Sequence, residues 1–187
     1  MELLTLPFET KEKFAEWLAK QHDKSAGVWM KLAKKATGIP SVTYQEALDV
    51  ALCYGWIDGQ KRSFDDKYFL QKFTPRRPKS VWSKINTEKV EILIASGEMK
   101  PSGLRAVEAA KQDGRWDEAY KSQKNMSVPV DFQSALRKNK AAKTFFESLT
   151  SAKRYSFLFR IETAKKAETR ERRIRQFVEM LGRGETF

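Results

Sequence analysis

The sequence predicts an α+β fold that is mostly α-helical, with a small three-stranded antiparallel sheet in its N-terminal half. Two observations carry this prediction. Residues 28–34 alternate apolar with more polar side chains, and residues 56–73 have the pattern of a hairpin, which together indicate strands. From Ser80 onward, by contrast, almost every signal is helical, with capping residues before the apolar stretches and glycines after several of them.

The first 55 residues predict a helix, a strand and a second helix. Residues 10–22 form an amphipathic pattern with aromatic and leucine side chains on one face. After the strand and a TGIPS turn, Thr43 and Glu46 have the spacing of a capping box that starts the second helix. Gly55 follows its last apolar residue, where a glycine commonly ends a helix.

The hairpin supplies the other two predicted strands. One arm starts at Trp56, the turn lies near Asp65 and Asp66, and residues 68–73 return. We expect these arms to pair with residues 28–34.

Several helices follow the hairpin. One is expected to start at Thr87 and stop at Gly97, and the next to start at Ser102 and stop at Gly114. Trp116 and Tyr120 then stand four residues apart, a spacing that brings two rings together on one helical face, where we expect them to pack in the core. A final basic pair of helices spans residues 151–181.

The polar stretch SQKNMSVP, residues 122–129, is the linker candidate. It separates an N-terminal α+β domain, residues 1–121, from a basic helical region, residues 130–187, which we expect to pack on the first.

The charge balance favours anionic partners. The chain has 187 residues and a formal net charge of +12, a balance that attracts nucleic acid or phosphorylated molecules. Its single cysteine, Cys53, cannot form an intrachain disulfide, which suits a reducing compartment. No apolar run approaches the roughly 20 residues that span a bilayer, and no signal peptide is recognisable, so we expect a cytoplasmic protein.

The residue inventory excludes several classes of enzyme. With one histidine, His22, and one cysteine, nucleophilic triads and zinc catalysis lack their side chains. Cys53 lies on the apolar side of a predicted helix and is expected to be a buried structural thiol, while His22 is expected to cap a helix. No phosphate-binding glycine motif occurs. We therefore assign no catalytic residue, metal ligand or cofactor, and leave open whether the chain is an enzyme.

The stretch FTPRRPKSVWSKIN, residues 73–86, predicts an anion pocket. Its two prolines stiffen the loop that carries Arg76 and Arg77. Ser80 and Ser83 can both cap a helix, and a helix N-terminus beside two guanidinium groups suits phosphate or carboxylate. Asp58 is the one candidate for a general base, or else the structural partner of an arginine. The candidate pocket comprises Asp58, Arg62, Arg76, Arg77, Ser80, Trp82, Ser83, Lys84 and Asn86.

The C-terminal region offers a second basic surface. Residues 137–187 hold 14 Lys and Arg against 6 Asp and Glu, a balance of +8. A polyanion-binding face would use Lys165, Lys166, Arg170, Arg172, Arg173 and Arg175. The alternative is a solvated helix face on which Glu168 and Glu171 pair with arginines one turn later.

Several segments carry a resemblance to a known family: GVWMKLAKK, VTYQEALDVALCYGWIDGQ, FTPRRPKSVWSKIN, GEMKPSGLRAVEAAKQDGRWDEAY and AKKAETRERRIRQFVEML. In this order they resemble the YdeI/OmpD-associated family, also labelled bacteriocin-protection or OmdA-type. The resemblance implies a link to envelope stress, antimicrobial-peptide resistance and an outer-membrane porin. It supplies no reaction, cofactor or catalytic residue.

Three functions follow from these observations. The first, which we favour, is a cytoplasmic binding protein whose anion pocket takes a phosphate-bearing or carboxylate small molecule; an enzyme acting on a phosphorylated small molecule is a variant of it. The second is a nucleic-acid-binding protein that uses the basic C-terminal helices. The third is a stress adaptor that binds an unknown protein partner through exposed aromatic side chains.

Overall fold

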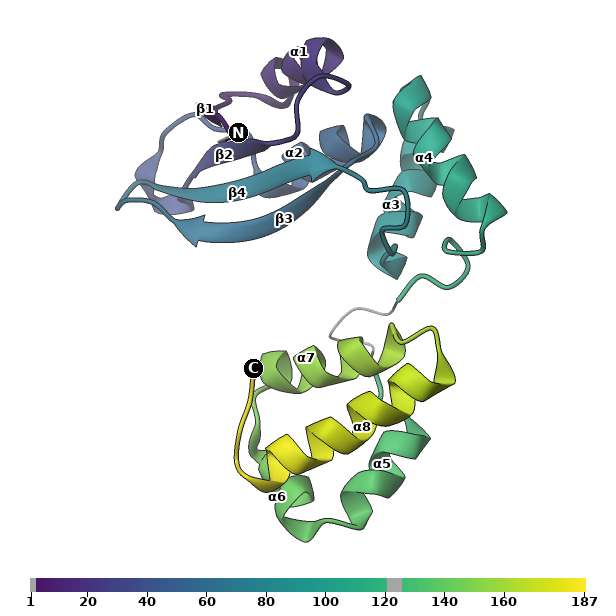
Figure 1. Cartoon of the computed structure of the whole chain (residues 1–187). Helices are drawn as coiled ribbons and strands as arrows, with labels where there is room; N and C mark the ends of the chain where they lie inside the picture. Colours follow the sequence, from purple (N-terminus) through teal and green to yellow (C-terminus); the bar gives the residue numbers. More distant parts are fainter. Residues whose placement is uncertain (1–2, 121–125) are drawn as a thin grey trace. The chain divides into compact units, whose positions relative to one another are not determined.

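A computed structural model describes residues 3–120 and 126–187. The chain divides into two compact units, unit 1 (Met1–Ala119) and unit 2 (Tyr120–Phe187). Of the predicted linker, residues 122–125 lie outside the described part, and residues 126–129 have no regular structure. Within the described ranges, the sheet lies in unit 1, and unit 2 is built of helices (Figure 1).

Unit 1 contains a four-stranded sheet in the order β1-β2-β4-β3. Its strands are β1 (Thr5–Pro7), β2 (Val28–Ala33), β3 (Trp56–Ser63) and β4 (Tyr68–Pro75). The three predicted strands pair antiparallel, β2 with β4 and β4 with β3. The prediction of a purely antiparallel three-stranded sheet is nevertheless wrong, because β1 adds a fourth strand parallel to β2.

The extra strand is too short to give a sequence signal. It has three residues and ends at Pro7, which has no backbone N–H and is therefore tolerated at a sheet edge. Long-range packing determines its position: the N–H of Trp29 donates to the carbonyl of Leu4 at 2.9 Å, and Leu6 packs on the core of unit 1. Periodicity over three residues cannot reveal such contacts.

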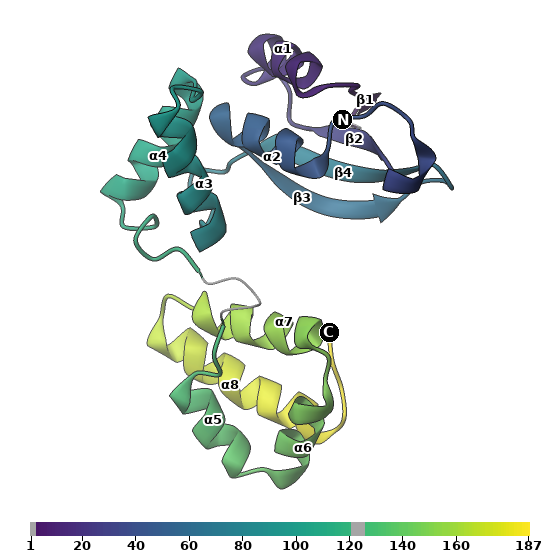
Figure 2. The ribbon, with the colours of Figure 1, turned by 180° about the vertical axis from the view of Figure 1, so that it is seen from behind.

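One face of the sheet is covered by α1 (Lys11–Gln21) and α2 (Tyr44–Cys53), as Figure 2 shows for α2. The pleat explains this, since β2 buries every second side chain, and Phe14 and Leu18 of α1 lie fully buried in the same core. α1 lies within the predicted range of residues 10–22, with Thr10 as its N-cap, and α2 starts at its predicted cap, Thr43. The predicted capping box is present: Glu46 N donates to Thr43 Oγ1 at 3.3 Å, and Thr43 N donates to Glu46 Oε2 at 2.8 Å.

A 3₁₀ turn, η1 (Lys35–Thr37), follows β2, and α3 (Lys84–Ala95) and α4 (Pro101–Gln112) complete the regular structure of unit 1. The predicted starts at Thr87 and Ser102 are wrong by several residues and by one, respectively. Ser83, one of the two serines predicted as possible caps, caps α3, and Pro101 occupies the first turn of α4. Serine, threonine and proline all signal a helix start, so spacing alone could not choose among them.

The C-terminal end of α2 abuts the N-terminal end of α4. The carbonyl of Cys53 accepts a hydrogen bond from Lys100 N at 3.0 Å. Gly103 lies against the same carbonyl, so close that a Cβ atom there would be 2.2 Å from the oxygen. Gly55 completes the exit from α2 with φ +77°, a left-handed conformation that glycine adopts without strain. This junction joins the sheet layer to α3 and α4.

Residues 113–118 form turns rather than the expected helix. Trp116 is buried and packs on Trp82, with ring centroids 5.0 Å apart. Tyr120 instead contacts Phe159 of unit 2 at 4.8 Å. Both rings pack, but not on each other, because Gly114 adopts φ +78° and ends the helical path before them.

Unit 2 consists of α5 (Val130–Arg137), α6 (Lys140–Ser148), α7 (Ser151–Glu162) and α8 (Ala167–Gly182). Its core is rich in phenylalanine, with Phe132, Phe146, Phe157 and Phe177 packed largely edge to face. The last helix, α8, contributes Ile174, Phe177 and Leu181 to this core, and all three are buried.

Candidate functional site

The 73–86 stretch leaves the sheet and enters α3 through an ordered loop. The N–H of Arg76 donates to the carbonyl of Gly55 at 3.0 Å, which anchors the loop where α2 ends. Ser80 closes a turn onto the carbonyl of Arg77 at 2.9 Å, and Ser83 then caps α3 by accepting from Asn86 N at 3.2 Å. Local backbone bonds thus position the side chains that were predicted to bind an anion.

The two adjacent arginines have different surroundings. The Arg76 guanidinium lies over the Trp82 ring, 3.6 Å from its centroid, and donates from Nη2 to the carbonyl of Val81 at 2.7 Å. Arg77 is exposed. Only Arg76 of the pair is therefore held against the buried indole.

A second arginine reaches this loop from a distant part of the sequence. Arg115 Nη1 donates to the carbonyl of Ser80 at 2.9 Å, while its Nε binds Asp113 at 2.7 Å, and its side chain is only 11% exposed. Arg76 and Arg115 consequently hold the neighbouring carbonyls of Val81 and Ser80. The sequence did not lead us to predict Arg115 as a site residue. Its neighbour Trp116 was expected in the core, and that expectation could have drawn attention to Arg115.

The Oγ atom of Ser80 and the Nε1 atom of Trp82 are buried in this loop without a hydrogen-bond partner in the described part of the chain. Trp82 as a whole is 2% exposed. Leaving such a donor unsatisfied costs about 1–3 kcal/mol, so an acceptor that reached it would be bound favourably. We call Arg76, Ser80, Trp82 and Arg115 the arginine–tryptophan loop site.

The remaining predicted pocket residues are more scattered. Asp58 accepts a hydrogen bond from the Tyr44 hydroxyl at 2.9 Å on the helix-covered face of the sheet. Arg62 lies on the other face, over the Trp29 ring at 4.5 Å. Lys84 is exposed in the first turn of α3. The structure therefore brings Ser80, Trp82 and Ser83 near Arg76, whereas Asp58 and Arg62 lie on opposite faces of the sheet.

The basic C-terminal residues divide into structural and exposed ones. Arg170 donates to both carboxylate oxygens of Asp131, at 2.6 and 3.1 Å, and this pair of hydrogen bonds lowers the pKa of Asp131. Arg170 also donates to the carbonyl of Ile161. Arg173 donates to the carbonyl of Arg160. Of the six residues predicted to bind a polyanion, four are exposed: Lys165, Lys166, Arg172 and Arg175.

The ion pairs expected along α8 do not form. In the residues that the structure describes, neither Glu168 with Arg172 nor Glu171 with Arg175 lies within ion-pair distance.

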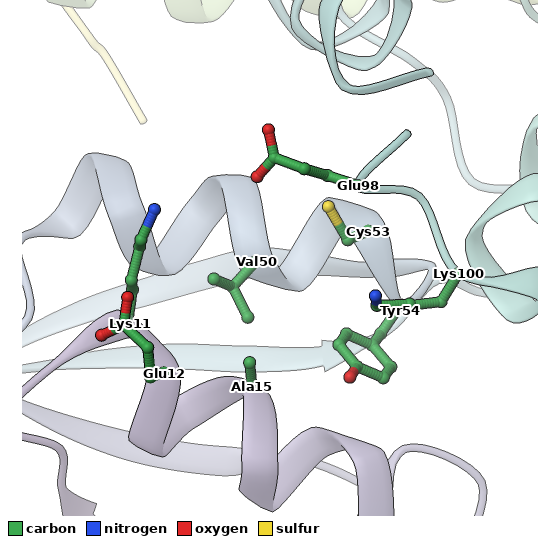
Figure 3. A pocket seen from close by; sticks show the side chains of 8 residues that line it. All are labelled: Lys11, Glu12, Ala15, Val50, Cys53, Tyr54, Glu98 and Lys100. Carbon is green, nitrogen blue, oxygen red and sulfur yellow. The ribbon is translucent and has the colours of Figure 1, made fainter. Parts of the chain in front are cut away.

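A cavity of about 170 Å³ lies between α1, the end of α2 and the segment before α4 (Figure 3). Its lining is mainly apolar, with charged groups at the rim; it comprises Lys11, Glu12, Ala15, Val50, Cys53, Tyr54, Glu98 and Lys100. Sequence reasoning did not predict it, because its walls come from three separate elements.

Cys53 is the reactive group of this cavity, but its thiol stays protonated at neutral pH. Burial raises its pKa to about 11, and the nearby Glu98 carboxylate contributes in the same direction. The thiolate is the nucleophile, so this environment does not activate it. The prediction that Cys53 is buried is confirmed.

Other site classes find little support in the described ranges. They contain no group of three His, Cys, Asp or Glu side chains that could hold a metal ion. They also contain no helix that is long and apolar enough to cross a membrane.

Two family models match two different parts of the chain. The family described as a domain of unknown function, DUF8412, matches residues 6–106, more than half of the chain. The family described as "Bacteriocin-protection, YdeI or OmpD-Associated" (OmdA) matches residues 125–184, which include all four helices of unit 2. The resemblance to the OmdA family is thereby confirmed, although the match is confined to the C-terminal part. No curated protein and no solved structure matches the chain.

Proposed function

We propose that this chain, which belongs to the DUF8412 family, is a cytoplasmic binding protein for a small phosphate-bearing or carboxylate molecule. One observation supports the proposal above the others. At the arginine–tryptophan loop site, two arginines hold adjacent carbonyls beside a buried indole, whose Nε1 has no partner among the described residues.

An anion is the ligand that this chemistry favours. Guanidinium groups and neutral N–H and O–H donors all bind anionic oxygens, and charge-assisted hydrogen bonds are about twice as strong as neutral ones. Arg77 and Lys84, both exposed at this end of unit 1, add positive charge that attracts an anion from solution. The N-terminus of α3 contributes a partial positive charge of the same sign.

The biological role proposed for this binding follows the family description of unit 2. Because residues 125–184 match the bacteriocin-protection family, we propose that the protein contributes to resistance against bacteriocins or related envelope stress. The single cysteine fits a reducing cytoplasm, so the contribution would be indirect. Deleting the gene in its host and measuring survival under antimicrobial peptide tests this part separately.

Isothermal titration with inorganic phosphate and pyrophosphate at low ionic strength tests the binding itself. Arg76→Gln and Arg115→Gln should each abolish measurable binding, because each removes a guanidinium from the site. Arg77→Gln is the matched control, since it removes the same charge from an exposed neighbour. It should weaken binding only slightly.

Two further variants separate binding from folding. Trp82→Phe keeps an aromatic ring under Arg76 but removes the Nε1 donor, and Ser80→Ala removes a hydroxyl that has no partner in the described part. Both should fold as the wild type and bind phosphate more weakly. Wild-type affinity in both, or equal losses in the Arg77 and Arg76 variants, would refute the proposal.

A further inference from the structure

The face of the sheet opposite α1 and α2 carries aromatic and cationic side chains. Side chains alternate along a strand, so while Val28, Met30 and Leu32 enter the core, Trp29 and Lys31 of β2 point away from it. In Figure 1, β3 and β4 lie in front of α2, whereas in Figure 2 α2 crosses in front of the strands. The outward side chains are therefore not covered by the helices that fill the core of unit 1.

The register assembles these side chains into one surface. Trp29 pairs with Lys72 of β4, Lys31 pairs with Leu70, and Leu70 in turn pairs with Arg62 of β3. Tyr68 stands two residues before Leu70 on the same side. We call Trp29, Lys31, Arg62, Tyr68, Leu70 and Lys72 the open sheet face.

Each aromatic ring of the open sheet face has a cation over it. Arg62 lies 4.5 Å and Lys72 5.7 Å from the Trp29 centroid, and Lys31 lies 4.6 Å from that of Tyr68. Lys31 is also 4.6 Å from the ring of Phe64, which is 49% exposed at the hairpin end. Aromatic and cationic groups thus alternate across three strands.

The strand positions of this face carry charge of one sign, and the Asp65 carboxylate of the hairpin turn lies within electrostatic range of Lys31 beside it. The outward positions of β2, β3 and β4 include three cations and no carboxylate, although the chain has 24 Asp and Glu residues. Gly59 lies beside Lys72, with 3.7 Å from its virtual Cβ to the lysine Cβ, so no side chain rises above the surface there. An anionic ligand with flat rings is complementary to such a surface.

We infer that the open sheet face binds single-stranded nucleic acid. Unpaired bases stack on Trp29 and Tyr68, which accept any base because every base has a π face. When a base stacks on a ring, the cation that covered the ring moves to a flanking phosphate. The cations concerned lie on neighbouring strands and are Arg62, Lys72 and Lys31. This surface shares no residue with the arginine–tryptophan loop site or with the basic positions of α8.

The same features disfavour a duplex. Bases in a duplex are stacked on one another and cannot reach Trp29 or Tyr68. Phosphates alone would satisfy the three cations but would leave both rings unused. Stacking should therefore make a single strand bind more tightly than a duplex or a sulfated polysaccharide of equal charge.

Fluorescence anisotropy with a labelled oligothymidylate tests the inference. A length of about twelve nucleotides covers one stacking surface of this kind. The wild-type chain should bind it more tightly than the matching duplex or a heparin oligosaccharide. Three phosphate contacts predict that log K falls with log salt concentration at a slope of about −2, since each contact on a single strand contributes about −0.7.

Variants separate stacking from charge. Trp29→Ala should weaken binding about tenfold with little change in the salt slope, because base stacking is worth a factor of this order. Trp29→Phe should restore most of the affinity. Arg62→Gln and Lys72→Gln should each flatten the slope by about 0.7.

The matched control removes two charges elsewhere. Arg172→Gln with Arg175→Gln neutralises exposed cations of α8 and should leave the affinity and slope unchanged. Circular dichroism of each variant confirms folding.

Three results would overturn the inference. They are wild-type affinity in a folded Trp29→Ala variant, an equal loss in the α8 double variant, or equally tight binding of heparin or duplex. Binding of anionic phospholipid vesicles that competes with the oligonucleotide, and that is the tighter of the two, would assign the face to a membrane surface instead.

Discussion

Gly103→Ala is expected to destabilise unit 1, although it places a better helix former in α4. Alanine in a helix interior is about 0.5–1 kcal/mol more favourable than glycine. At this position, however, the new Cβ would lie 2.2 Å from the backbone oxygen of Cys53 and 2.9 Å from the methyl group of Met99. The methionine can move, but the carbonyl cannot, because it is the end of α2.

The size of this loss in stability follows from the atoms that the added methyl group must displace. Forcing an extra methyl group into a packed junction costs about 1–3 kcal/mol. Moving α4 away also strains the 3.0 Å hydrogen bond from Lys100 N to Cys53 O, worth about 1 kcal/mol. After subtracting the gain in helix propensity, we expect a net loss of about 1–3 kcal/mol.

Urea denaturation followed by tryptophan fluorescence measures this loss in unit 1 alone. All five tryptophans of the chain, at positions 17, 29, 56, 82 and 116, lie in that unit. Gly59→Ala is the control, since its Cβ would have no neighbour closer than 3.7 Å. The midpoint should fall for Gly103→Ala and stay near the wild-type value for the control. A midpoint for Gly103→Ala at or above the wild type would refute the reasoning.

Three further outcomes are expected. Burial raises the pKa of Cys53 from 9.0 to about 11, so the protonated thiol stabilises the fold below pH 9, and about 2–3 kcal/mol of stability is lost as the pH rises through 11. The difference in unfolding free energy between wild type and Cys53→Ala should therefore shrink over that pH range, and a constant difference would contradict the prediction. Asp131→Asn should lower the stability of unit 2 by about 1 kcal/mol at neutral pH, measured in thermal melts followed by circular dichroism. Since hydrogen bonds from Arg170 lower the pKa of Asp131, this difference in stability between variant and wild type should vanish at strongly acidic pH, where the carboxyl is protonated. Thr43→Ala should lower the urea midpoint of unit 1 by the equivalent of about 1 kcal/mol, because it breaks the capping box.

Local chemistry made much of the fold predictable. The Thr43–Glu46 capping box, the left-handed Gly55 and the hairpin turn near Asp65 depend on residues within a few positions of one another, and all are present. The strand β1 depends instead on contacts more than twenty residues away. Three residues ending in proline carry no periodic signal, and so the sheet was predicted one strand too small.

The candidate site shows the same division. Arg76, Ser80 and Trp82 lie on one short loop, and sequence reasoning grouped them correctly from composition. Arg115 stands 35 residues beyond Ser80 and reaches its carbonyl because residues 113–118 turn back instead of continuing α4. Helical periodicity had placed these residues on a helix. The direction in which a side chain leaves such a turn is decided by tertiary packing.

An arginine guanidinium lies over a tryptophan ring at two places in the described part of unit 1, and burial gives these two pairs different consequences. The guanidinium of Arg76 is bound to a backbone carbonyl above Trp82, which is 2% exposed, so no ring ligand can displace it without breaking the loop. Arg62 over Trp29 is exposed, and its guanidinium donates a long hydrogen bond of 3.3 Å to Gln60 Oε1. Moving it off the ring therefore costs little, since an exposed cation–π contact is worth only about 0.5–1 kcal/mol, less than the stacking of one base. The buried pair consequently suits an ion that approaches the donors from outside, and the exposed pair suits a ligand that takes the place of the cation.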